Sequence, residues 1–415
     1  MSLMQRKPQR VLYVENGIGY GGAIICLRHL VKHLDYNRYQ PLLITGRTGE
    51  RYRDIANDVP WKHIPDRHFD TVGWRAKLDA ATFPSRIPGL RFVLSQLIAR
   101  TDDLGNFLPF FIQFLWTAIC FRPHIIHTNN EPLCNRAAVL VAKMMRVKLA
   151  AHVRSNLEAS KLLHWLYTKP DLFLSVSHWV SDALADLDVP EDKRRVIYDG
   201  IDLSRLNIHA GGTPFRQQHQ IGNDDFAVGL VGLLIPWKGQ RIFLEAAKQL
   251  HTQIPGLKMV IVGGTPDECS DYEAELRRTV SNEGLQDCVL FTGNINDMPS
   301  AYNGLDIVVS ASTDPEPLGT MVIECMAMAR PLIGPAHGGA AEMADHEETA
   351  LLFKPGSADD LAESILRLYR EPELRQHIAT QARQKALLTF AVETHADAVQ
   401  ALYDSMTGTA TPKES

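Results

Sequence analysis

Two glutamates in the segment Glu316–Glu324 are the residues whose spacing most directly suggests chemistry. A glycine at 319 breaks the chain and apolar, helix-forming residues follow it, so we predict a helix that begins at Gly319 or Thr320. Glu316 would then lie in the loop at the mouth of this helix. Glu324 would lie about one turn inside it and face the same side.

A helix start offers backbone N–H groups to an anion, because its first amides have no partner within the helix. We expect the amides of Gly319, Thr320 and Met321 to point to where phosphate oxygens bind. A carboxylate can accept two hydrogen bonds, so one glutamate suits the hydroxyls of a ribose and the other those of a hexose. The alternative is a surface charge at each position, although the apolar residues around Glu324 predict a buried helix interior.

Lys238 is the cation best placed to join them. It stands beside Gly239, after the apolar run 226–230 and directly before a predicted helix at 240–250. A lysine fixed at a helix start is a natural counter-ion for a diphosphate. The alternative is an exposed lysine with no ligand.

A glycine-rich turn with Gly21 and Gly22 follows the first apolar run and precedes a predicted helix at 23–34. Glycines let the backbone approach a ligand closely. The turn resembles a dinucleotide fingerprint, but its third glycine is out of register, and Asp35 precedes the second predicted strand instead of ending it. By itself the turn leaves NAD and a different phosphate ligand equally open.

Short apolar runs alternate with amphipathic stretches along the whole chain. The runs are apolar on both faces, as in buried parallel strands, so the pattern predicts an α/β fold of parallel sheets covered by helices. The predicted strands are 11–15, 41–45, 124–128, 148–153, 172–176, 196–198, 226–230, 258–262, 289–292, 307–310, 332–334 and 351–353. The clearest predicted helices are 23–34, 179–187, 240–250, 272–283 and 361–369.

A length of 415 residues predicts two domains. We place the first at 1–206 and the second at 207–388, with a linker in the polar, Gly- and Pro-containing stretch 207–225. A helix at about 389–407 is expected to pack back onto the first domain, and the tail 408–415 to be disordered. The segment 66–106 is the least regular, and it is either an acceptor loop or simply irregular structure.

Charge is distributed unevenly along the chain, whose net charge is -5. Residues 1–205 hold 28 Lys and Arg against 20 Asp and Glu, or +8, and the remainder holds 15 against 28, or -13. The basic half suits an anionic acceptor or an anionic membrane surface, or the imbalance is without function.

The apolar run 107–121 is shorter than the ~20 residues that span a bilayer and predicts a core helix.

The six cysteines are scattered and form no Cys-x-x-Cys pair, which argues against a zinc site or a disulfide framework and for a reducing cytoplasm. The apolar run 11–14 is too short for a signal sequence.

Asp186 and Asp188 form an Asp-x-Asp, which metal-dependent A-type transferases carry at a strand end. Here the pair ends a predicted helix, so we interpret it as a solvated helix end.

In their order and spacing, several motifs together resemble the retaining B-type (GT-B fold) glycosyltransferases of family four, glycosyl transferase group 1. Glu316–Glu324 fits the family's pattern of two glutamates with seven residues between them. The other matching segments are Gly21–Ala23, His124–His127, Ser175–Ser177, Val196–Asp202, Pro236–Gly239 and Gly338–Glu342. Each match is short, but their order extends the resemblance over nearly the whole chain.

This resemblance implies two Rossmann-like domains that face each other across a cleft, the first for the acceptor and the second for a nucleotide-sugar donor. Glu324 would hold the donor ribose, and Glu316 the hydroxyls of the transferred sugar. Lys238 would neutralise the departing diphosphate together with backbone groups of Leu318, Gly319, Thr320 and Met321.

The resemblance also assigns residues outside this segment. Gly21 and Gly22 would let the first domain close on the donor. His152 is similar to the family's active-site histidine near the donor sugar, although a structural histidine is the equal alternative. The turn with Gly293 and Asn294 is our prediction for contacts with the base.

At one position the sequence departs from the family. The family commonly has an arginine two residues after the valine of the turn that precedes Lys238, and here that position is Leu233. A phosphate contact is therefore missing or is supplied by another residue such as Arg154 or Arg241. The departure favours, to a small degree, weak or absent catalysis.

The implied function is transfer of a hexose from a UDP- or GDP-sugar to a glycan, lipid-linked or polysaccharide acceptor, with retention of configuration. We expect no metal, because a lysine and a helix dipole would stabilise the leaving group. We also expect no cofactor and no nucleic-acid partner. The location would be the cytoplasm of a bacterium, at the inner face of the membrane. The alternatives are an epimerase or phosphorylase on the same fold, a dehydrogenase with NAD, and a nucleotide-sugar-binding protein without turnover.

Overall fold

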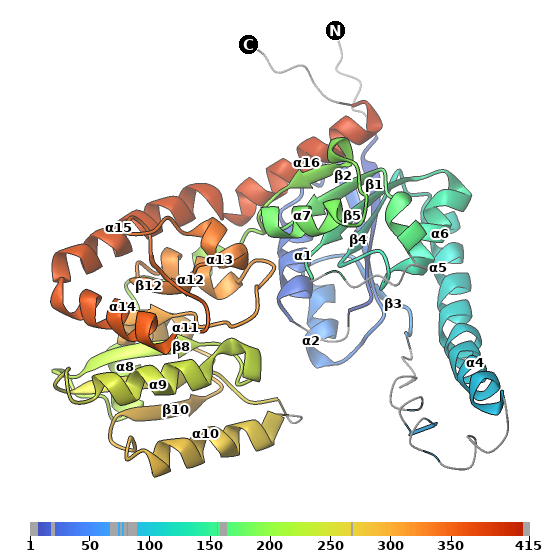
Figure 1. The fold of residues 1–415 in the computed structure, drawn as a ribbon. Helices are drawn as coiled ribbons and strands as arrows, with labels where there is room; N and C mark the ends of the chain where they lie inside the picture. Colours follow the sequence, from blue (N-terminus) through green and yellow to red (C-terminus); the bar gives the residue numbers. More distant parts are fainter. Residues whose placement is uncertain are drawn as a thin grey trace, which may run out of the picture. The chain divides into compact units, whose positions relative to one another are not determined.

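A computed structural model gives the fold (Figure 1). It describes residues 7–17, 21–66, 74, 77–78, 81, 89–155, 157, 164–266 and 269–409. Most of the tail predicted to be disordered lies outside these residues. Along the chain, two compact units form: one comprises Met1–Ser175, Val180–Val196 and Ala396–Ser415, and the other comprises Val176–Trp179 and Ile197–His395.

The first unit is built on a parallel sheet of seven strands in the order β3-β2-β1-β4-β5-β6-β7. Its strands are β1 Gln9–Glu15, β2 Tyr39–Thr45, β3 Trp61–His63, β4 Ile125–Asn129, β5 Lys148–Val153, β6 Leu172–Ser175 and β7 Arg194–Val196. Its helices are α1 Gly22–Lys32, α2 Glu50–Arg53, α4 Leu90–Asp102, α5 Leu108–Phe121, α6 Arg136–Met145 and most of α7 His178–Ala185.

The second unit repeats this design with six parallel strands in the order β10-β9-β8-β11-β12-β13. Its strands are β8 Phe226–Val231, β9 Leu257–Val262, β10 Val289–Gly293, β11 Ile307–Val309, β12 Leu332–Pro335 and β13 Leu351–Phe353. Its helices are α8 Thr213–Gln218, α9 Gln240–Leu250, α10 Ser270–Asn282, α11 Met298–Gly304, α12 Thr320–Ala327, α13 Gly338–Met343, α14 Ala358–Arg370 and α15 Pro372–Thr389.

Burial on both faces explains why these runs form parallel strands. Every residue of β8 is buried, and helices α9 and α14 pack together over its sheet. A sheet covered on both sides needs apolar residues at successive positions instead of at alternate ones. The predicted α/β fold with two Rossmann-like domains is confirmed.

All twelve predicted strands are present, and only the sixth is displaced, because β7 ends at Val196 where the prediction began. The strand that the sequence did not predict is β3, which pairs with β2 at the edge of the first sheet. It has three residues, Trp61, Lys62 and His63, and an exposed lysine at its centre. An edge strand of this length carries no periodic apolar signal.

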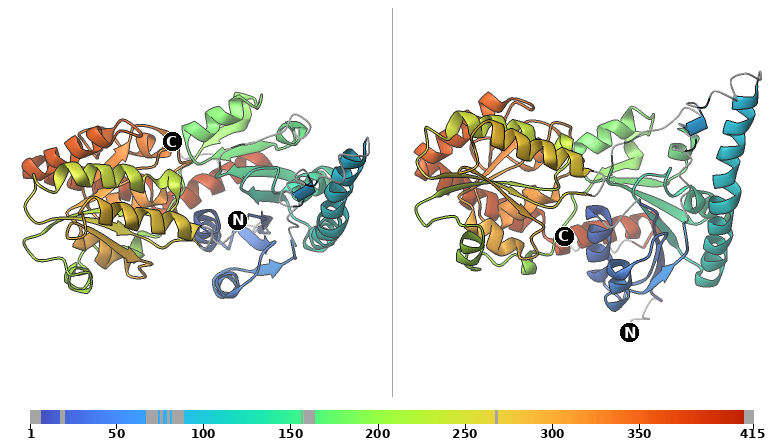
Figure 2. Two further views of the ribbon diagram at one scale, coloured as in Figure 1. Left: turned by 60° about the horizontal axis from the view of Figure 1, so that its bottom comes forward. Right: turned by 90° about the horizontal axis from the view of Figure 1, so that it is seen from below.

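The run 107–121 is not the core helix that we predicted. It forms α5, which a five-residue π-helix, Asp103–Phe107, joins to α4, so that 90–121 is one helical arm (Figures 1 and 2). Only one face of α5 is buried. The stretch Leu104–Phe121 is long and apolar enough to cross a membrane, but 28% of it is buried in the protein.

The stretch 207–225, predicted to be the linker, lies inside the second unit and contains helix α8. One of its glycines, Gly212, is explained by packing. A Cβ on Gly212 would overlap the backbone carbonyl of Asn303 and lie 2.6 Å from the amide nitrogen of Gly304, because α8 packs against α11. The chain passes between the units earlier, at Ile197.

The last helix, α16 Val392–Thr407, begins in the second unit and belongs to the first from Ala396 onward. In the first unit its Tyr403 hydroxyl lies 3.0 Å from the Tyr13 hydroxyl and 2.7 Å from Nδ1 of His127. All three side chains are fully buried. This helix therefore completes the core over the first sheet.

The packing of α8 gives a testable prediction. Gly212→Ala should lower the free energy of unfolding by about 1–3 kcal/mol, because the new methyl group overlaps backbone atoms that cannot move alone. Gly211→Ala is the matched control, since its Cβ would meet nothing closer than 3.9 Å. Urea denaturation measures both. Equal stability of the two variants would show that this stretch is a loose connection.

Candidate active site

The strand order of the second sheet determines where a ligand can bind. The chain goes from β8 to β9 on one side and returns to β11 on the other side of β8. In open α/β sheets, ligands bind beside the carboxyl ends of the strands where the order reverses in this way. The loop after β8 carries Lys238, and the loop after β11 carries Glu316.

Lys238 ends a short 3-10 turn, Pro236–Lys238, and Gly239 follows it with a φ of 77°. This left-handed conformation favours glycine, and a Cβ there would also overlap the carbonyl group of Ala311. The Lys238 ammonium lies 4.6 Å from the centre of the Trp237 ring. Lysine is thus held at the start of α9, as predicted.

The structure brings Lys238 and Glu316 together. The Lys238 Nζ lies 2.7 Å from Oε1 of Glu316, and the two side chains are 19% and 15% exposed. The Ser312 hydroxyl donates to the same carboxylate oxygen. At this degree of burial the ion pair is shielded from much of the solvent, so its charges act strongly on a neighbouring group.

Two glycines fix the loop that carries Glu316. The amide of Gly339 donates to the Glu316 carbonyl at 2.8 Å. Gly338 has a φ of 61°, and a Cβ there would lie 2.8 Å from the same carbonyl oxygen. The start of α13 therefore packs directly against the loop, which explains the paired glycines of this motif.

Helix α12 begins at Thr320, as predicted, after Gly319 with a φ of 88°. None of the side chains that the structure describes caps this helix start. The Val322 amide bonds to the Gly319 carbonyl at 2.9 Å, and the amides of Thr320 and Met321 precede it in the first turn. Such amides and the helix dipole together favour an anion at this end. Leu318 is buried, and its backbone packs against Gly339.

Glu324 lies in the second turn of α12, where Oε2 accepts a hydrogen bond of 2.8 Å from the Tyr302 hydroxyl. Burial raises the pKa of the Glu324 carboxyl, and the Tyr302 hydrogen bond lowers it by less. A ligand hydroxyl that donated to this carboxylate would favour its charged form. Tyr302 was not predicted, because nothing in its sequence context sets it apart from a core tyrosine.

Leu233 lies in the turn between β8 and Lys238, and its side chain is 51% exposed. An apolar side chain therefore occupies an accessible position where the family commonly has a cation. Arg241, one suggested substitute, is engaged elsewhere: its guanidinium makes two hydrogen bonds of 2.9 Å to Glu275 and lies 5.0 Å over the Tyr272 ring.

The predicted base contacts lie at the carboxyl end of β10. Gly293 has a φ of 66°, and the exposed Asn294 packs so closely on Gly264 that a Cβ there would overlap its side chain. The loops after β9 and β10 are thus in contact.

Asp186 and Asp188 are exposed after the last turn of α7, as predicted for a solvated helix end.

In the first unit, Gly22 is the first residue of α1 and Gly21 its N-cap. Among the residues that the structure describes, no atom lies within 4 Å of a Cβ placed on either glycine. Packing therefore does not require glycine here, and the backbone at this helix start is open to a close approach.

A buried carboxylate that we did not predict lies where the strand order of the first sheet reverses. Glu15 ends β1 and accepts hydrogen bonds from the side chains of Asn129 and Asn130 and from the Gly17 amide. Burial raises the pKa of Glu15 to about 7, although the hydrogen bonds and Arg154 act in the opposite direction. Arg154 also donates to Asn129. The sequence does not predict this role for Glu15, because a single acidic residue at the end of an apolar run belongs to no recognisable motif.

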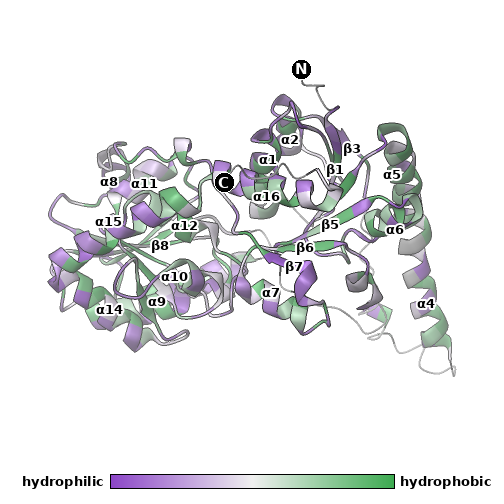
Figure 3. Cartoon of the chain, turned by 90° about the horizontal axis from the view of Figure 1, so that it is seen from above, coloured by the Kyte–Doolittle hydropathy of each residue, from purple (hydrophilic) through white to green (hydrophobic). Residues whose placement is uncertain are grey.

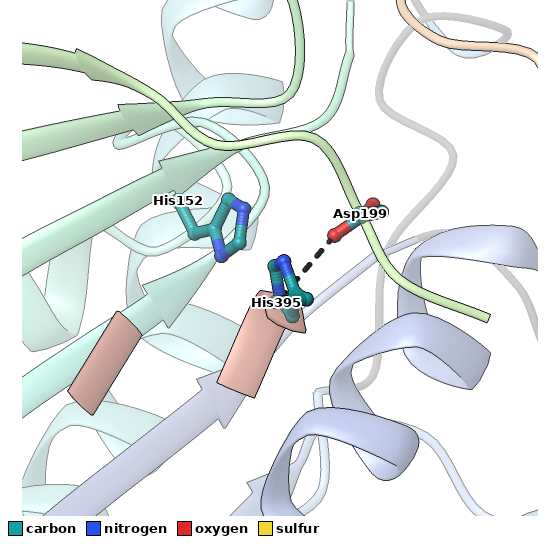
Figure 4. A group of neighbouring side chains, drawn as sticks. All are labelled: His152, Asp199 and His395. Atoms are coloured by element: carbon teal, nitrogen blue, oxygen red, sulfur yellow. Dashed lines mark ion pairs between the residues drawn. The ribbon is translucent and has the colours of Figure 1, made fainter. Parts of the chain in front are cut away.

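His152 is fully buried on β5, with its ring edge toward His127 at a centroid distance of 5.3 Å. Figure 4 draws His152 with a pair from the second unit, in which His395 Nε2 lies 3.8 Å from Asp199. His395 also contacts the Tyr198 carbonyl at 2.8 Å. The pair joins the segment after β7 to the start of α16, a role that the sequence motif 196–202 did not reveal.

Comparison with known proteins agrees with this geometry. Residues 20–205 match the family described as Glycosyltransferase Family 4, and residues 213–385 match the family described as Glycosyl transferases group 1. The two matches follow each other along the chain and include both glycine-rich helix starts and both glutamates.

Two curated relatives and one solved structure illustrate the similarity. The lipopolysaccharide core biosynthesis mannosyltransferase LpsB of Rhizobium meliloti is 27% identical over 352 residues, 79% of this chain and 97% of that protein. The GDP-mannose-dependent alpha-(1-6)-phosphatidylinositol monomannoside mannosyltransferase of Mycobacterium tuberculosis is 28% identical over 48% of this chain, which spans about half (52%) of that protein.

The solved structure is that of Anabaena Alr3699/HepE in complex with UDP. It has a TM-score of 0.79 at 23% identity and covers 96% of this chain and 100% of its own, which shows a common fold. With two Rossmann-like sheets, a lysine and two glutamates around one helix start, and both family matches in sequence, the chain belongs to the group 1 glycosyltransferases of the GT-B fold.

Proposed function

We propose that this chain is a retaining hexosyltransferase that moves a hexose from a UDP- or GDP-sugar to a glycan, lipid-linked or polysaccharide acceptor. One observation carries the proposal: Lys238 lies 2.7 Å from Glu316 at the loop that leads into α12. A cation, a carboxylate and the first amides of a helix lie together at the carboxyl ends of neighbouring strands. Such a set of groups suits a molecule that contains both a diphosphate and a sugar.

In the proposed reaction, the bond between the anomeric carbon and the diphosphate oxygen breaks as the acceptor oxygen bonds to that carbon from the same face. The acceptor proton passes to a phosphate oxygen of the leaving diphosphate. Lys238 and the first amides of α12 stabilise the negative charge that develops there, and such stabilisation is usually the largest catalytic contribution. Because these groups supply the positive charge, the proposed mechanism uses no metal.

The carboxylates would position the donor. Glu316 would accept hydrogen bonds from hydroxyls of the transferred sugar, and Glu324 from those of the ribose. The acceptor would bind to the first unit, where Glu15 and Asn129 provide polar groups at the carboxyl ends of β1 and β4. His152 would act beside the donor sugar.

The names of relatives support this range of substrates. One is named a GDP-mannose-dependent alpha-(1-6)-phosphatidylinositol monomannoside mannosyltransferase, another is named a lipopolysaccharide core biosynthesis mannosyltransferase, and a structure of similar fold contains UDP. We propose, as the sequence suggested, that the reaction takes place in the cytoplasm, at the inner face of a membrane. Incubation with UDP- and GDP-sugars and mixed acceptors, followed by mass spectrometry of the products, tests donor and acceptor together.

A second candidate is a GT-B protein that binds a nucleotide sugar without transferring it, or one that epimerises it. The exposed Leu233 favours this alternative, because it removes a cation from the expected phosphate site. Release of nucleoside diphosphate only when an acceptor is present would support the transferase. A donor that binds but is returned unchanged, or as its epimer, would support the second candidate.

Lys238→Ala should slow transfer by about 10²–10³-fold and change the KM for the donor much less, because charge at the leaving group develops mainly in the transition state. Initial rates of nucleoside diphosphate release measure this. Lys354→Ala removes an exposed lysine of the same unit and serves as control. A wild-type rate in the Lys238 variant would remove this residue from the site.

Glu324→Gln should weaken donor binding and yet stabilise the folded protein above pH 5. The pKa of Glu324 is raised from 4.5 in the folded state, so wild-type stability falls as the pH rises from about 4.5 through the raised value. A glutamine does not lose this stability. Thermal unfolding between pH 4.5 and 8 and donor titration measure the two effects.

The exposed Glu363→Gln is the matched control and should change neither property. If the stability difference between Glu324→Gln and the wild type were the same at pH 8 as at pH 4.5, and the variant bound donor like the wild type, Glu324 would be an ordinary helix residue.

Leu233→Arg should tighten nucleoside diphosphate binding by about 10- to 100-fold, because a charge-assisted hydrogen bond is worth about 1.5–3 kcal/mol. The exposed position lets the longer side chain enter without repacking the core. Calorimetric titration with UDP and GDP is the measurement, and Leu387→Arg, at a similarly exposed leucine of α15, is the control. Equal affinity of both variants would show that the diphosphate lies elsewhere.

A further inference from the structure

The exposed side of the helical arm 90–121 is apolar along most of its length. Eight large hydrophobic side chains of the arm are exposed. Trp116 has the largest side chain of the eight, and 66% of its surface is exposed. The set is Phe92, Val93, Leu97, Leu104, Leu108, Ile112, Trp116 and Ile119. Figure 3 shows the hydrophobic colour along α5.

These residues form one stripe. From Leu104 they recur at intervals of four, four, four and three residues, which places them on one face of the helix. The opposite face, with Phe110, Phe114 and Ala118, is buried in the first unit. A surface helix normally presents charged residues to water on the side away from the core, and this arm does the reverse.

Cations gather at the C-terminal end of the stripe. Arg122 follows α5, Lys143 and Arg146 lie at the end of α6, and Lys148 begins β5, and all four are exposed. They lie near the amino ends of β4 and β5, because α5 packs on α6 and Lys148 pairs with Ile125 at the start of β4. Among the arm side chains that the structure describes, none of the exposed ones is acidic.

We propose that this face, the stripe on 92–119 with its basic end, docks onto the surface of an anionic lipid bilayer. An interfacial helix buries its apolar side at the level of the lipid headgroups, where tryptophan is favoured, and nearby lysines and arginines attract anionic lipids. The arm lies on the bilayer and does not cross it, because Phe110, Phe114 and Ala118 remain packed inside the protein.

Charge argues for lipid over a second copy of the chain. A two-fold pairing along the stripe would place the basic end either against the same end of the partner or against the other end of its arm. That other end carries Arg91 and Arg100 and, in the sequence, also Asp102 and Asp103. The first arrangement brings like charges together and the second offers the cations no net negative charge, whereas an anionic bilayer complements the cations of the basic end.

The proposal adds a docking surface to the proposed function and rests on it only for the side of the membrane. The full-length protein, without donor, is sedimented with vesicles of phosphatidylcholine containing 30% phosphatidylglycerol and with vesicles of phosphatidylcholine alone. We expect binding to the anionic vesicles that falls with added salt. Transfer to a water-soluble acceptor is assayed separately, so failure of docking and failure of catalysis are distinguished.

Ile112→Ser/Trp116→Ser should weaken vesicle binding at least tenfold, and Leu387→Ser/Leu388→Ser is the matched control, since both leucines are exposed on α15. Lys143→Gln/Arg146→Gln should weaken binding to anionic vesicles roughly thirtyfold, because each cation near such a surface contributes about 1 kcal/mol. Unchanged melting temperatures would show that the variants fold. Brominated lipids should quench wild-type fluorescence more than that of Trp116→Phe.

Three results would overturn the proposal. The first is that the wild type fails to sediment with anionic vesicles. The second is that Ile112→Ser/Trp116→Ser binds these vesicles as well as the control variant does. The third is a homodimer in analytical ultracentrifugation that Ile112→Ser/Trp116→Ser dissociates, because a second copy would then cover the face.

Discussion

The ion pair between Lys238 and Glu316 is the interaction on which the candidate site depends. At 2.7 Å and with both side chains largely buried, its Coulomb attraction is several kcal/mol, but removal of both charges from water costs a similar amount. The pair therefore adds little to stability. Its value lies in keeping an uncompensated lysine from being buried alone while no anion is bound.

Strand order makes this pair possible. Lys238 and Glu316 are far apart in the sequence, and they meet because β8 and β11 are neighbours in the sheet although two strands separate them along the chain. Gly239 and Gly338 then bring the loops close, since a side chain at either position would overlap or crowd backbone atoms. In the proposed function, a bound diphosphate would replace Glu316 as partner of the lysine and leave the carboxylate to the sugar.

Much of the fold was predictable, because buried parallel strands are apolar at successive positions and produce a strong local signal. The same holds for the start of α12, where Gly319 breaks a helix-forming run. Residues that depend on distant partners gave no such signal. Tyr302 becomes the partner of Glu324, and Ser312 that of Glu316, only after the sheet has formed. The pair of Asp199 and His395 depends on the return of the chain through α16.

The failures of prediction have physical causes. The composition of the run 107–121 predicts a core helix, because composition alone does not say on how many sides a helix is covered. The glycines at 211 and 212 predict a linker, because close packing and flexibility select the same residue, and only the contact of Gly212 with Asn303 distinguishes the two cases.

Two exposed apolar features, Leu233 and the stripe on 92–119, depart from the usual rule that surface positions are polar, and neither exposure is required by the core around it. Natural sequences tend to break such rules where function demands it. At Leu233 a single side chain is involved, so its effect is confined to one phosphate contact. On the arm, eight side chains repeat the same departure at helical spacing. An exposed apolar face of that extent promotes aggregation unless something covers it, and the cations at its end favour a negatively charged surface for that role.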